Sequence, residues 1–440
     1  MRKLLVSLLA LLVCVPAHGL DRQLGTDYHA RREALAKKAG GLVVMLAPLE
    51  KNDAVFGFRQ EDNFYYLSGV TVPGAGLLVA PAVEAQGETA ARSYTEILFL
   101  PPRNLRLEKY TGPQLGADDA NATKVTGFDR VEEMAKLPEE VEKLLANQKP
   151  VVFTEMASQG NTPASEDMTA FLKHSNAMVF FQDIKPMLTS LRTVKDAGEI
   201  SLVQKAVDAS VAAHSAAMKT VKPNVKEYEV SALLNYEWDR RGCEGPSYSP
   251  IVGSGHNSTV LHYSENKNTM KTGEVVVIDA AAECSMYAAD ITRTLPVNGH
   301  FTARQKEIYD IVLGAQEAAA AAFQSGKSTL VGDGENSLNK VARDYIKSHG
   351  KDLHGQPLDQ YFIHGLGHYI GLNVHDDGDY KVPLAPGMVF TIEPGIYIPE
   401  ENIGVRIEDD FLVTADGKLV KMSAALPSKA EDVEKAMATR

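Results

Sequence analysis

Four short apolar runs, each closed by turn-forming or polar residues, mark the first part of the chain as a region of buried strands. They are GLVVMLAP at 41–48, AGLLVAP at 75–81, TEILFLPP at 95–102 and KPVVFTE at 149–155. Runs of this length beside glycine or proline are typical of strands inside a sheet. The spacing of apolar and charged positions at 129–148 predicts a helix. Residues 20–187 are therefore expected to form an α/β domain.

The pattern changes after residue 187. Residues 190–221 contain a long helical pattern and predict one or two helices. Farther along, β-branched runs alternate with tight polar turns, which is typical of antiparallel strand pairs. We expect a second, α+β domain over 188–425. The remaining residues, 426–440, form a charged tail that is either helical or frayed.

The first nineteen residues are unlike the rest. Arg2 and Lys3 precede an apolar run at 4–15, and Ala17 and Gly19 place small residues before a cleavage point. This is the pattern of a secretory signal peptide over residues 1–19, so we expect export to a periplasm or to the outside. A retained membrane anchor is disfavoured because the run is too short to span a bilayer. No later segment has the pattern of a transmembrane span.

Charge and cysteine content narrow the possibilities. The formal net charge of −12 disfavours nucleic acid as a partner, because phosphate binding needs a basic surface. Beyond the signal peptide only Cys243 and Cys284 remain. One pair could form a disulfide, but we expect buried free thiols, because a chain of this length has enough core without a covalent staple.

An acidic strand pair is predicted at 273–297, GEVVVIDAAAECSMYAADITRTLPV. If the turn centre lies between Cys284 and Ser285, Asp279 and Asp290 are directly opposite each other on one face of the pair. Two carboxylates this close repel, so a positive group is expected between them.

A second acidic pair is predicted at 387–414, where a turn near Glu400 and Glu401 places Glu393 opposite Glu408. A solvated sheet face would explain each acid singly, but not why Glu393 follows an apolar run. We therefore favour a metal site. Carboxylates with an imidazole suit hard or borderline divalent ions, with Mn²⁺ favoured and Co²⁺ or Zn²⁺ possible. Two such ions together can activate water and polarise a carbonyl.

Three of the twelve histidines lie in FIHGLGHYIGLNVHDDG at 362–378. His364 and His368 have the four-residue spacing of the zinc motif H-E-x-x-H, but glycine replaces the glutamate. Glycines at 365, 367 and 371 disfavour a regular helix. They indicate instead that the backbone approaches another group closely.

Several of these strings together resemble the pita-bread metallopeptidase family, which includes methionine aminopeptidase, aminopeptidase P, prolidase and the metal-free creatinases. The strings are LHYSEN, VIDAAAECSMYAADITRT, HGLGHYIGLNVHD, EPGIYI and GVRIEDD. Upstream, DNFYYLSGV and KYTGPQLGADDANATKVTGFD resemble the amino-terminal domain of aminopeptidase P and prolidase. The resemblance implies a pita-bread catalytic domain and a dinuclear metal centre.

The resemblance also implies roles for individual residues. The expected metal ligands are Asp279, Asp290, His368, Glu393 and Glu408, with Asp290 and Glu408 bridging the two ions. Glu393 is also the expected general base. The residues expected to contact substrate are His262, His364, His375, Tyr397 and Arg406, and the three histidines among them are expected to assist catalysis.

Two related activities fit this resemblance. Prolidases of this kind carry a longer segment after VHD, with an arginine that holds the free carboxylate of a dipeptide. Here DDGDYKVPLAPGM at 376–388 is short and contains no arginine. We therefore expect an aminopeptidase that removes the residue before proline from peptides, with prolidase as the alternative. A catalytically silent binding protein is disfavoured because all five ligands are present. Relatives are often dimers or tetramers, so a homo-oligomer is possible.

Overall fold

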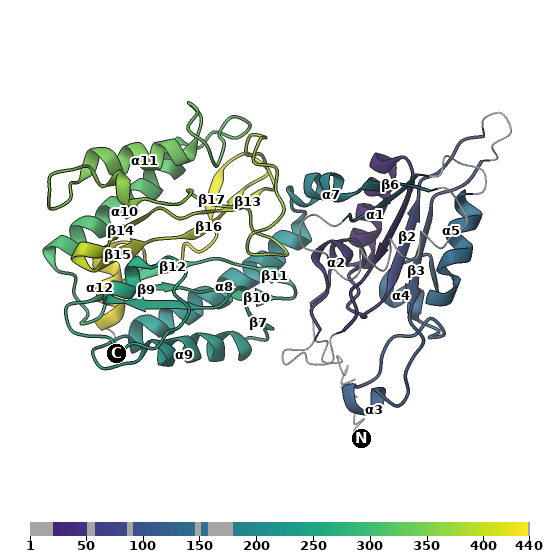
Figure 1. Ribbon diagram of the computed structural model, residues 1–440, viewed down its shortest axis with the longest axis horizontal. Coiled ribbons are helices and arrows are strands. Elements are labelled where there is room, and N and C mark those ends of the chain that lie inside the picture. Colours follow the sequence, from purple (N-terminus) through teal and green to yellow (C-terminus); the bar gives the residue numbers. More distant parts are fainter. Residues whose placement is uncertain (1–20, 51–57, 86–90, 146–150, 157–178, 439–440) are drawn as a thin grey trace, which may run out of the picture.

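The computed structural model describes residues 21–50, 58–85, 91–145, 151–156 and 179–438, and Figure 1 shows them as two lobes. The predicted signal peptide at 1–19 lies outside these residues. Within the described part of the chain, no helix has the length and apolar character needed to cross a membrane.

A six-stranded mixed sheet forms the core of the amino-terminal region, by which we mean the described residues up to Asp183. Its strand order is β4-β3-β2-β1-β5-β6. The strands are β1 (Leu42–Leu46), β2 (Gly76–Ala80), β3 (Thr95–Leu100), β4 (Arg130–Glu133), β5 (Val151–Thr154) and β6 (Phe180–Asp183). The helices are α1 (Gly25–Ala39), α2 (Asp62–Ser68), α3 (Glu108–Thr111), α4 (Ala122–Thr126) and α5 (Leu137–Leu145), with a 3-10 turn η1 (Met134–Lys136). The four apolar runs become β1, β2, β3 and β5, as predicted.

The helix predicted over 129–148 is wrong in its first half. Residues Arg130–Glu133 form β4, which pairs in parallel with β3. The α-helix begins only at Leu137. Pro138 lies in the first turn of this helix, where a residue without a backbone N–H is tolerated, and a 3-10 turn at Met134–Lys136 separates the helix from β4.

Two helices, α7 (Lys185–Arg192) and α8 (Ala197–Thr220), connect the lobes, which confirms the helical prediction for 190–221. Residues 193–196 separate the two helices. Asp196 caps α8, because its carboxylate accepts a hydrogen bond from the Glu199 amide. The last helix, α12 (Ala430–Ala438), packs against α8 and buries Val433 and Met437. Most of the described part of the charged tail is therefore a docked helix.

The second lobe contains small antiparallel sheets flanked by helices (Figure 1). Its longer strands are β8 (Ile251–Ser254), β9 (Val275–Asp279), β12 (Thr292–Pro296), β13 (Val389–Ile392), β14 (Gly395–Ile398), β15 (Ile403–Arg406) and β16 (Asp409–Val413). The shorter strands are β7 (Gly245–Pro246), β10 (Ala282–Cys284), β11 (Tyr287–Ala288) and β17 (Leu419–Lys421). The helices are α9 (Glu227–Asp239), α10 (Ala303–Ala322) and α11 (Leu338–His349), with 3-10 turns η2 (Gly255–Thr259), η3 (Leu358–Tyr361) and η4 (Pro399–Glu401).

The first acidic strand pair forms with a register different from the predicted one. Asp279 lies opposite Thr292, and Cys284 lies opposite Tyr287. The turn is centred on Ser285 and Met286, whose φ angles of 56° and 72° are those of a two-residue turn with left-handed backbone. The prediction that Asp279 directly opposes Asp290 is therefore wrong, because the turn lies one residue farther along the chain.

The second acidic pair has the predicted register. Ile392 pairs with Asp409 on one side of the two glutamates, and Gly395 pairs with Arg406 on the other. The same register therefore continues past Pro394 and places Glu393 opposite Glu408. An isolated bridge between Thr292 and Glu408 joins this pair to the first one.

Cys243 and Cys284 form a disulfide, so the expectation of free thiols is wrong. Pairing of β7 with β10 places Pro246 beside Ala282 and Gly245 beside Glu283, which brings the two cysteines to a Cα–Cα distance of 4.2 Å. The length of the chain shows only that a staple is not required. It does not show which strands pair.

We predict that Cys284→Ser lowers the free energy of unfolding by about 2–4 kcal/mol, the usual loss for a disulfide that closes a long loop. The loop here has a sequence separation of 41. Urea unfolding of the metal-free protein, with and without reductant, measures the effect. Two reactive thiols in unreduced, denatured wild-type protein would contradict the pairing.

Candidate metal centre and substrate cavity

Asp279 and Asp290 are two nearly buried carboxylates that share one hydroxyl donor. Asp279 ends β9, and Asp290 lies just before β12. The Tyr248 hydroxyl lies 2.5 Å from Oδ1 of each aspartate. Because a phenol carries one proton, it donates to one carboxylate at a time. The shifted register makes the two aspartates diagonal neighbours on one face, and they still converge on a single group.

Glu393 and Glu408 come from facing strands of the second pair. The Thr292 hydroxyl donates to Oε2 of Glu408 at 2.6 Å, and the Thr391 hydroxyl lies 3.3 Å from Oε1 of Glu393. Glu408 is buried, whereas Glu393 is partly exposed. The threonines fix the orientation of both carboxylates.

His368 lies on an extended segment that pairs with β13. The Thr391 amide donates to the His368 carbonyl at 2.8 Å, and the Glu393 amide donates to the Leu366 carbonyl at 2.8 Å. Nε2 of His368 lies 3.4 Å from Oδ2 of Asp290 and 3.4 Å from Oε1 of Glu393. The backbone of β13 thus directs this imidazole toward the carboxylates.

The glycines of this stretch have different roles. A Cβ atom at Gly367 would lie 2.1 Å from the Thr391 carbonyl oxygen, so this position requires glycine. At Gly371 a Cβ atom would lie 2.2 Å from the Asp376 carboxylate. A Cβ atom at Gly365 would meet nothing within 4 Å, so the expectation of a close backbone approach is wrong there.

The pKa values of these groups reflect burial and mutual repulsion. Burial raises the pKa of Glu393 to about 7, although the positive charge of His368 opposes the shift. Burial and the neighbouring carboxylates also raise the pKa of Asp290, and they raise that of Glu408 well above its usual value. For His368, burial favours the neutral ring, but Asp290 and Glu393 raise its pKa to about 9. The cluster therefore favours the uptake of positive charge, which a divalent cation would supply in place of protons.

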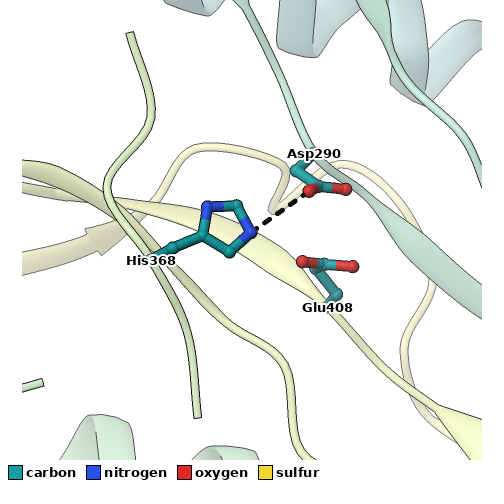
Figure 2. Close-up of side chains that lie close together, drawn as sticks. All are labelled: Asp290, His368 and Glu408. Carbon is teal, nitrogen blue, oxygen red and sulfur yellow. Dashed lines mark ion pairs between the residues drawn. The ribbon is translucent and has the colours of Figure 1, made fainter. Parts of the chain in front are cut away.

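The donor set fits divalent metal ions. Ligand atoms of Asp290, His368 and Glu408 lie within 4.8 Å of one another, and Figure 2 shows these side chains converging on a common space. Asp279 and Glu393 flank the three, so the structure brings all five predicted ligands together. Carboxylate oxygens and one imidazole, without thiolate, are typical ligands of Mn²⁺ and other hard or borderline ions.

A cavity of about 570 Å³ opens onto these carboxylates, and its lining includes four of the predicted substrate residues. They are His262, His364, His375 and Arg406. Tyr397 is not among the lining residues: its hydroxyl lies 2.9 Å from Nε2 of His364 and accepts a hydrogen bond from Arg406 at 2.8 Å. Tyr397 therefore holds the His364 ring by a hydrogen bond without lining the cavity itself.

The two outer histidines differ in their surroundings. Burial and the charge of Arg406 lower the pKa of His364 to about 4, so this ring is neutral near neutral pH. His375 is exposed, and its ring packs edge-on against that of His368 with centroids 4.3 Å apart. A neutral His364 can donate or accept a proton in a hydrogen bond with bound substrate.

Sequence reasoning missed the hydroxyl and carboxyl groups that support the cluster. They are Tyr248, Thr292, Thr391 and Asp410, of which Asp410 accepts the Asp290 amide at 3.0 Å. The two threonines and Asp410 lie within two residues of a predicted ligand, which was an available signal. Tyr248 lies more than thirty residues before Asp279, and no local pattern indicated it.

The comparisons with known proteins cover both lobes. The model of metallopeptidase family M24 matches residues 201–415, and that of the aminopeptidase P amino-terminal domain matches 28–153. An Xaa-Pro aminopeptidase of Haemophilus influenzae is 36% identical over 417 residues, 90% of this chain and 93% of that protein. The Xaa-Pro aminopeptidase of Escherichia coli is 33% identical over 441 residues, covering 93% and 97%. The solved structure of E. coli aminopeptidase P with the inhibitor Pro-Leu has a TM-score of 0.83 at 30% identity, covering 95% of this chain and 99% of that one.

We predict that Asp290→Ala removes bound metal while the protein stays folded. Loss of a group that only hydrogen-bonds to a metal ligand already costs about 10–100-fold in metal affinity. Loss of a ligand itself should cost at least as much. Metal content after equilibrium dialysis against Mn²⁺ measures the effect, with circular dichroism as the check on folding. His364→Ala and the exposed Asp310→Ala serve as controls and should keep their metal. Normal metal content in Asp290→Ala would contradict the ligand assignment.

Proposed function

The chain belongs to metallopeptidase family M24, and from this premise we propose that it releases the first residue of peptides whose second residue is proline. Family membership together with the Xaa-Pro aminopeptidase relatives makes the chain a peptidase, and its carboxylate–histidine cluster gives it a group that can hold metal. The Xaa-Pro aminopeptidases similar to it match almost from end to end.

One observation about the charges in the cavity favours longer peptides over dipeptides as substrates. Among the described residues that line the cavity, Arg406 is the sole arginine or lysine. Its guanidinium is paired with the Asp279 carboxylate and donates to the Tyr397 hydroxyl. No free cation is therefore left in this lining to hold the carboxylate of a dipeptide. A cavity of this kind favours substrates that continue beyond proline.

The proposed cofactor is a pair of divalent ions, with Mn²⁺ first and Co²⁺ or Zn²⁺ as alternatives. The residues that would hold them are Asp279, Asp290, His368, Glu393 and Glu408. Such ions, when bound, activate water and polarise the carbonyl before proline. A homo-oligomer stays a prediction from the resemblance.

The chain's own residues then orient the substrate and move its protons. Glu393 is half-buried in the cavity lining, and its carboxylate is the group we propose as the general base. His364 is held by Tyr397 and faces the cavity as a neutral hydrogen-bonding group for the carbonyl or the scissile nitrogen. His262 and His375 occupy the same lining and complete the polar contacts to the peptide.

Apolar residues provide a surface for the proline ring. Ile251, Leu261 and Val374 line the cavity together with the histidines. The nitrogen of proline in a peptide carries no hydrogen, so a site that selects it needs no acceptor there. Ring packing and the missing donor together explain a preference for proline at the second position.

Prolidase is the second candidate activity. It rests on the shared fold and on the metal cluster, which both enzymes would use. The short segment at 376–388, without arginine, argues against it. A silent binding protein is disfavoured by the convergence of all five predicted ligands on the cavity.

We also propose that the protein is exported. The charged start, the short apolar run and the small residues before position 20 support a cleaved signal peptide. The disulfide between Cys243 and Cys284 is consistent with this, because disulfides persist mainly in oxidising compartments.

We predict that the Mn²⁺-loaded enzyme cleaves Xaa-Pro-Xaa peptides at least about 10-fold faster, in kcat/KM, than the corresponding Xaa-Pro dipeptide. The reason is that the cavity offers no cation for the dipeptide carboxylate, and a tenfold difference corresponds to about 1.4 kcal/mol of transition-state binding. Release of the first residue, measured by chromatography, gives both rates.

The matched control peptide carries alanine in place of proline and should be cleaved far more slowly. Chelation should abolish turnover, and Mn²⁺ should restore it. Cleavage restricted to the dipeptide would identify a prolidase and overturn the leading assignment.

We predict that the mature protein begins at or near Leu20. Expression of the full chain in a bacterial host, followed by separation of periplasm, medium and cytoplasm, gives the location. Amino-terminal sequencing of the exported fraction then locates the cleavage. A protein that keeps Met1 in that fraction would contradict the signal peptide.

A further inference from the structure

The segment 371–377 carries His375 and lies between the cavity and the amino-terminal region. None of the described residues that line the cavity comes from the amino-terminal region. That region nevertheless contacts the backbone and side chains of this segment at several points. These contacts therefore connect the amino-terminal region to a segment that lines the substrate cavity.

Arg59 makes the most direct of these contacts. Its Nη2 donates to the Leu372 carbonyl at 2.7 Å, its Nη1 donates to Asp62 at 2.8 Å, and its Nε donates to Glu283 at 2.8 Å. One guanidinium thus joins the start of α2, the hairpin between the two aspartate ligands, and the backbone of the segment. Its planar donors fix direction as well as distance.

A second, buried contact holds the other end of the segment. The Asp376 carboxylate is paired with Arg192, and it accepts a hydrogen bond from Lys195 at 2.9 Å. Arg192 also donates to the Asn63 side chain in α2 at 2.6 Å. Burial alone would raise the pKa of Asp376, but Lys195 and Arg192 keep it below its usual value. The residue next to His375 is therefore a fixed anion tied to the amino-terminal region.

The segment transmits this restraint to His375 through its backbone. The His375 amide donates to the Asn373 side chain at 3.1 Å, and Asn373 in turn donates to Asp62 at 3.3 Å. Among the described residues, none makes a hydrogen bond to the His375 ring itself. The ring contacts His368 edge-on, so its placement depends on where the backbone holds it.

We propose that Arg59 and Arg192 are positioning residues through which the amino-terminal region sets the place of His375 in the substrate cavity. This inference rests on the proposed function. Loss of Arg59 should leave the protein folded, because its side chain is 39% exposed and its carboxylate partners keep some contact with water, Asp62 at 15% and Glu283 at 13% exposed. Catalysis is more sensitive, since a displacement of about 1 Å can cost about 10²-fold in rate.

The test is a double-mutant cycle on the metal-loaded enzyme with Arg59→Ala and His375→Ala. Arg59→Ala alone should lower kcat by about 10-fold or more and leave metal content unchanged. In the His375→Ala background it should have almost no further effect, because the group it positions is gone. Asp62→Asn, which weakens the same contacts, should give the same pattern.

Arg130→Ala is the matched control. Arg130 pairs with Glu132 and Glu140 in the amino-terminal region, and its side chain is 43% exposed, close to the value for Arg59. It should leave kcat unchanged in both backgrounds. Equal losses from Arg59→Ala with and without His375, or an unchanged kcat, would overturn the proposal.

Hydrogen exchange gives a readout that does not depend on activity. Amides of 371–377 should exchange at least several-fold faster in Arg59→Ala than in wild type or Arg130→Ala. If the wild-type enzyme cleaves no Xaa-Pro peptide, the proposed function fails, and exchange alone then decides whether the restraint exists. Unchanged exchange in this segment would overturn it.

Discussion

The structure is organised around the burial of several carboxylates at one place. Four acids converge there, and each removes some hydration from the others: Asp279, Asp290, Glu393 and Glu408. Such a cluster repels itself and is costly to bury without compensating charge or donors. The protein supplies part of the compensation through Arg406, which pairs with Asp279, and through His368, which lies 3.4 Å from Asp290 and from Glu393. Divalent ions would supply the rest.

The surrounding strands make this arrangement possible because they hold the acids rigidly. Asp279 follows the fully buried run Val275–Ile278, and Glu393 follows the fully buried β13. Apolar packing, not attraction between the acids, therefore fixes where the carboxylates point. The bridge between Thr292 and Glu408 joins the two strand pairs, so the strand that follows Asp290 is hydrogen-bonded to the backbone of Glu408. A site on paired strands keeps its geometry better than one on loops.

Much of this could be predicted from the sequence, because the signals were local. Apolar runs predicted four of the six strands of the first sheet, and the residue types with the family resemblance predicted five ligands whose side chains the structure brings to one cavity. The register of a strand pair could be predicted only where the position of its turn could be predicted. It was correct across Glu393 and Glu408, and wrong at Asp279 because left-handed backbone at Ser285 and Met286 moved the turn by one residue.

The failures concern contacts between segments distant in sequence. The disulfide depends on the pairing of β7 with β10, and the Tyr248 hydroxyl reaches the aspartates from outside the hairpin. Local periodicity contains no information on either contact.

The carboxylate–histidine cluster and the residues proposed to contact substrate are held in place by different kinds of interaction. The cluster is built on strand ladders within one lobe. The residues proposed to contact substrate lie partly on 371–377, which has no regular ladder and depends on salt bridges and hydrogen bonds to other parts of the chain. Such contacts are weaker and more easily altered than a buried sheet. The carboxylate cluster therefore depends mainly on buried strands, whereas the position of 371–377 depends in part on contacts between the lobes.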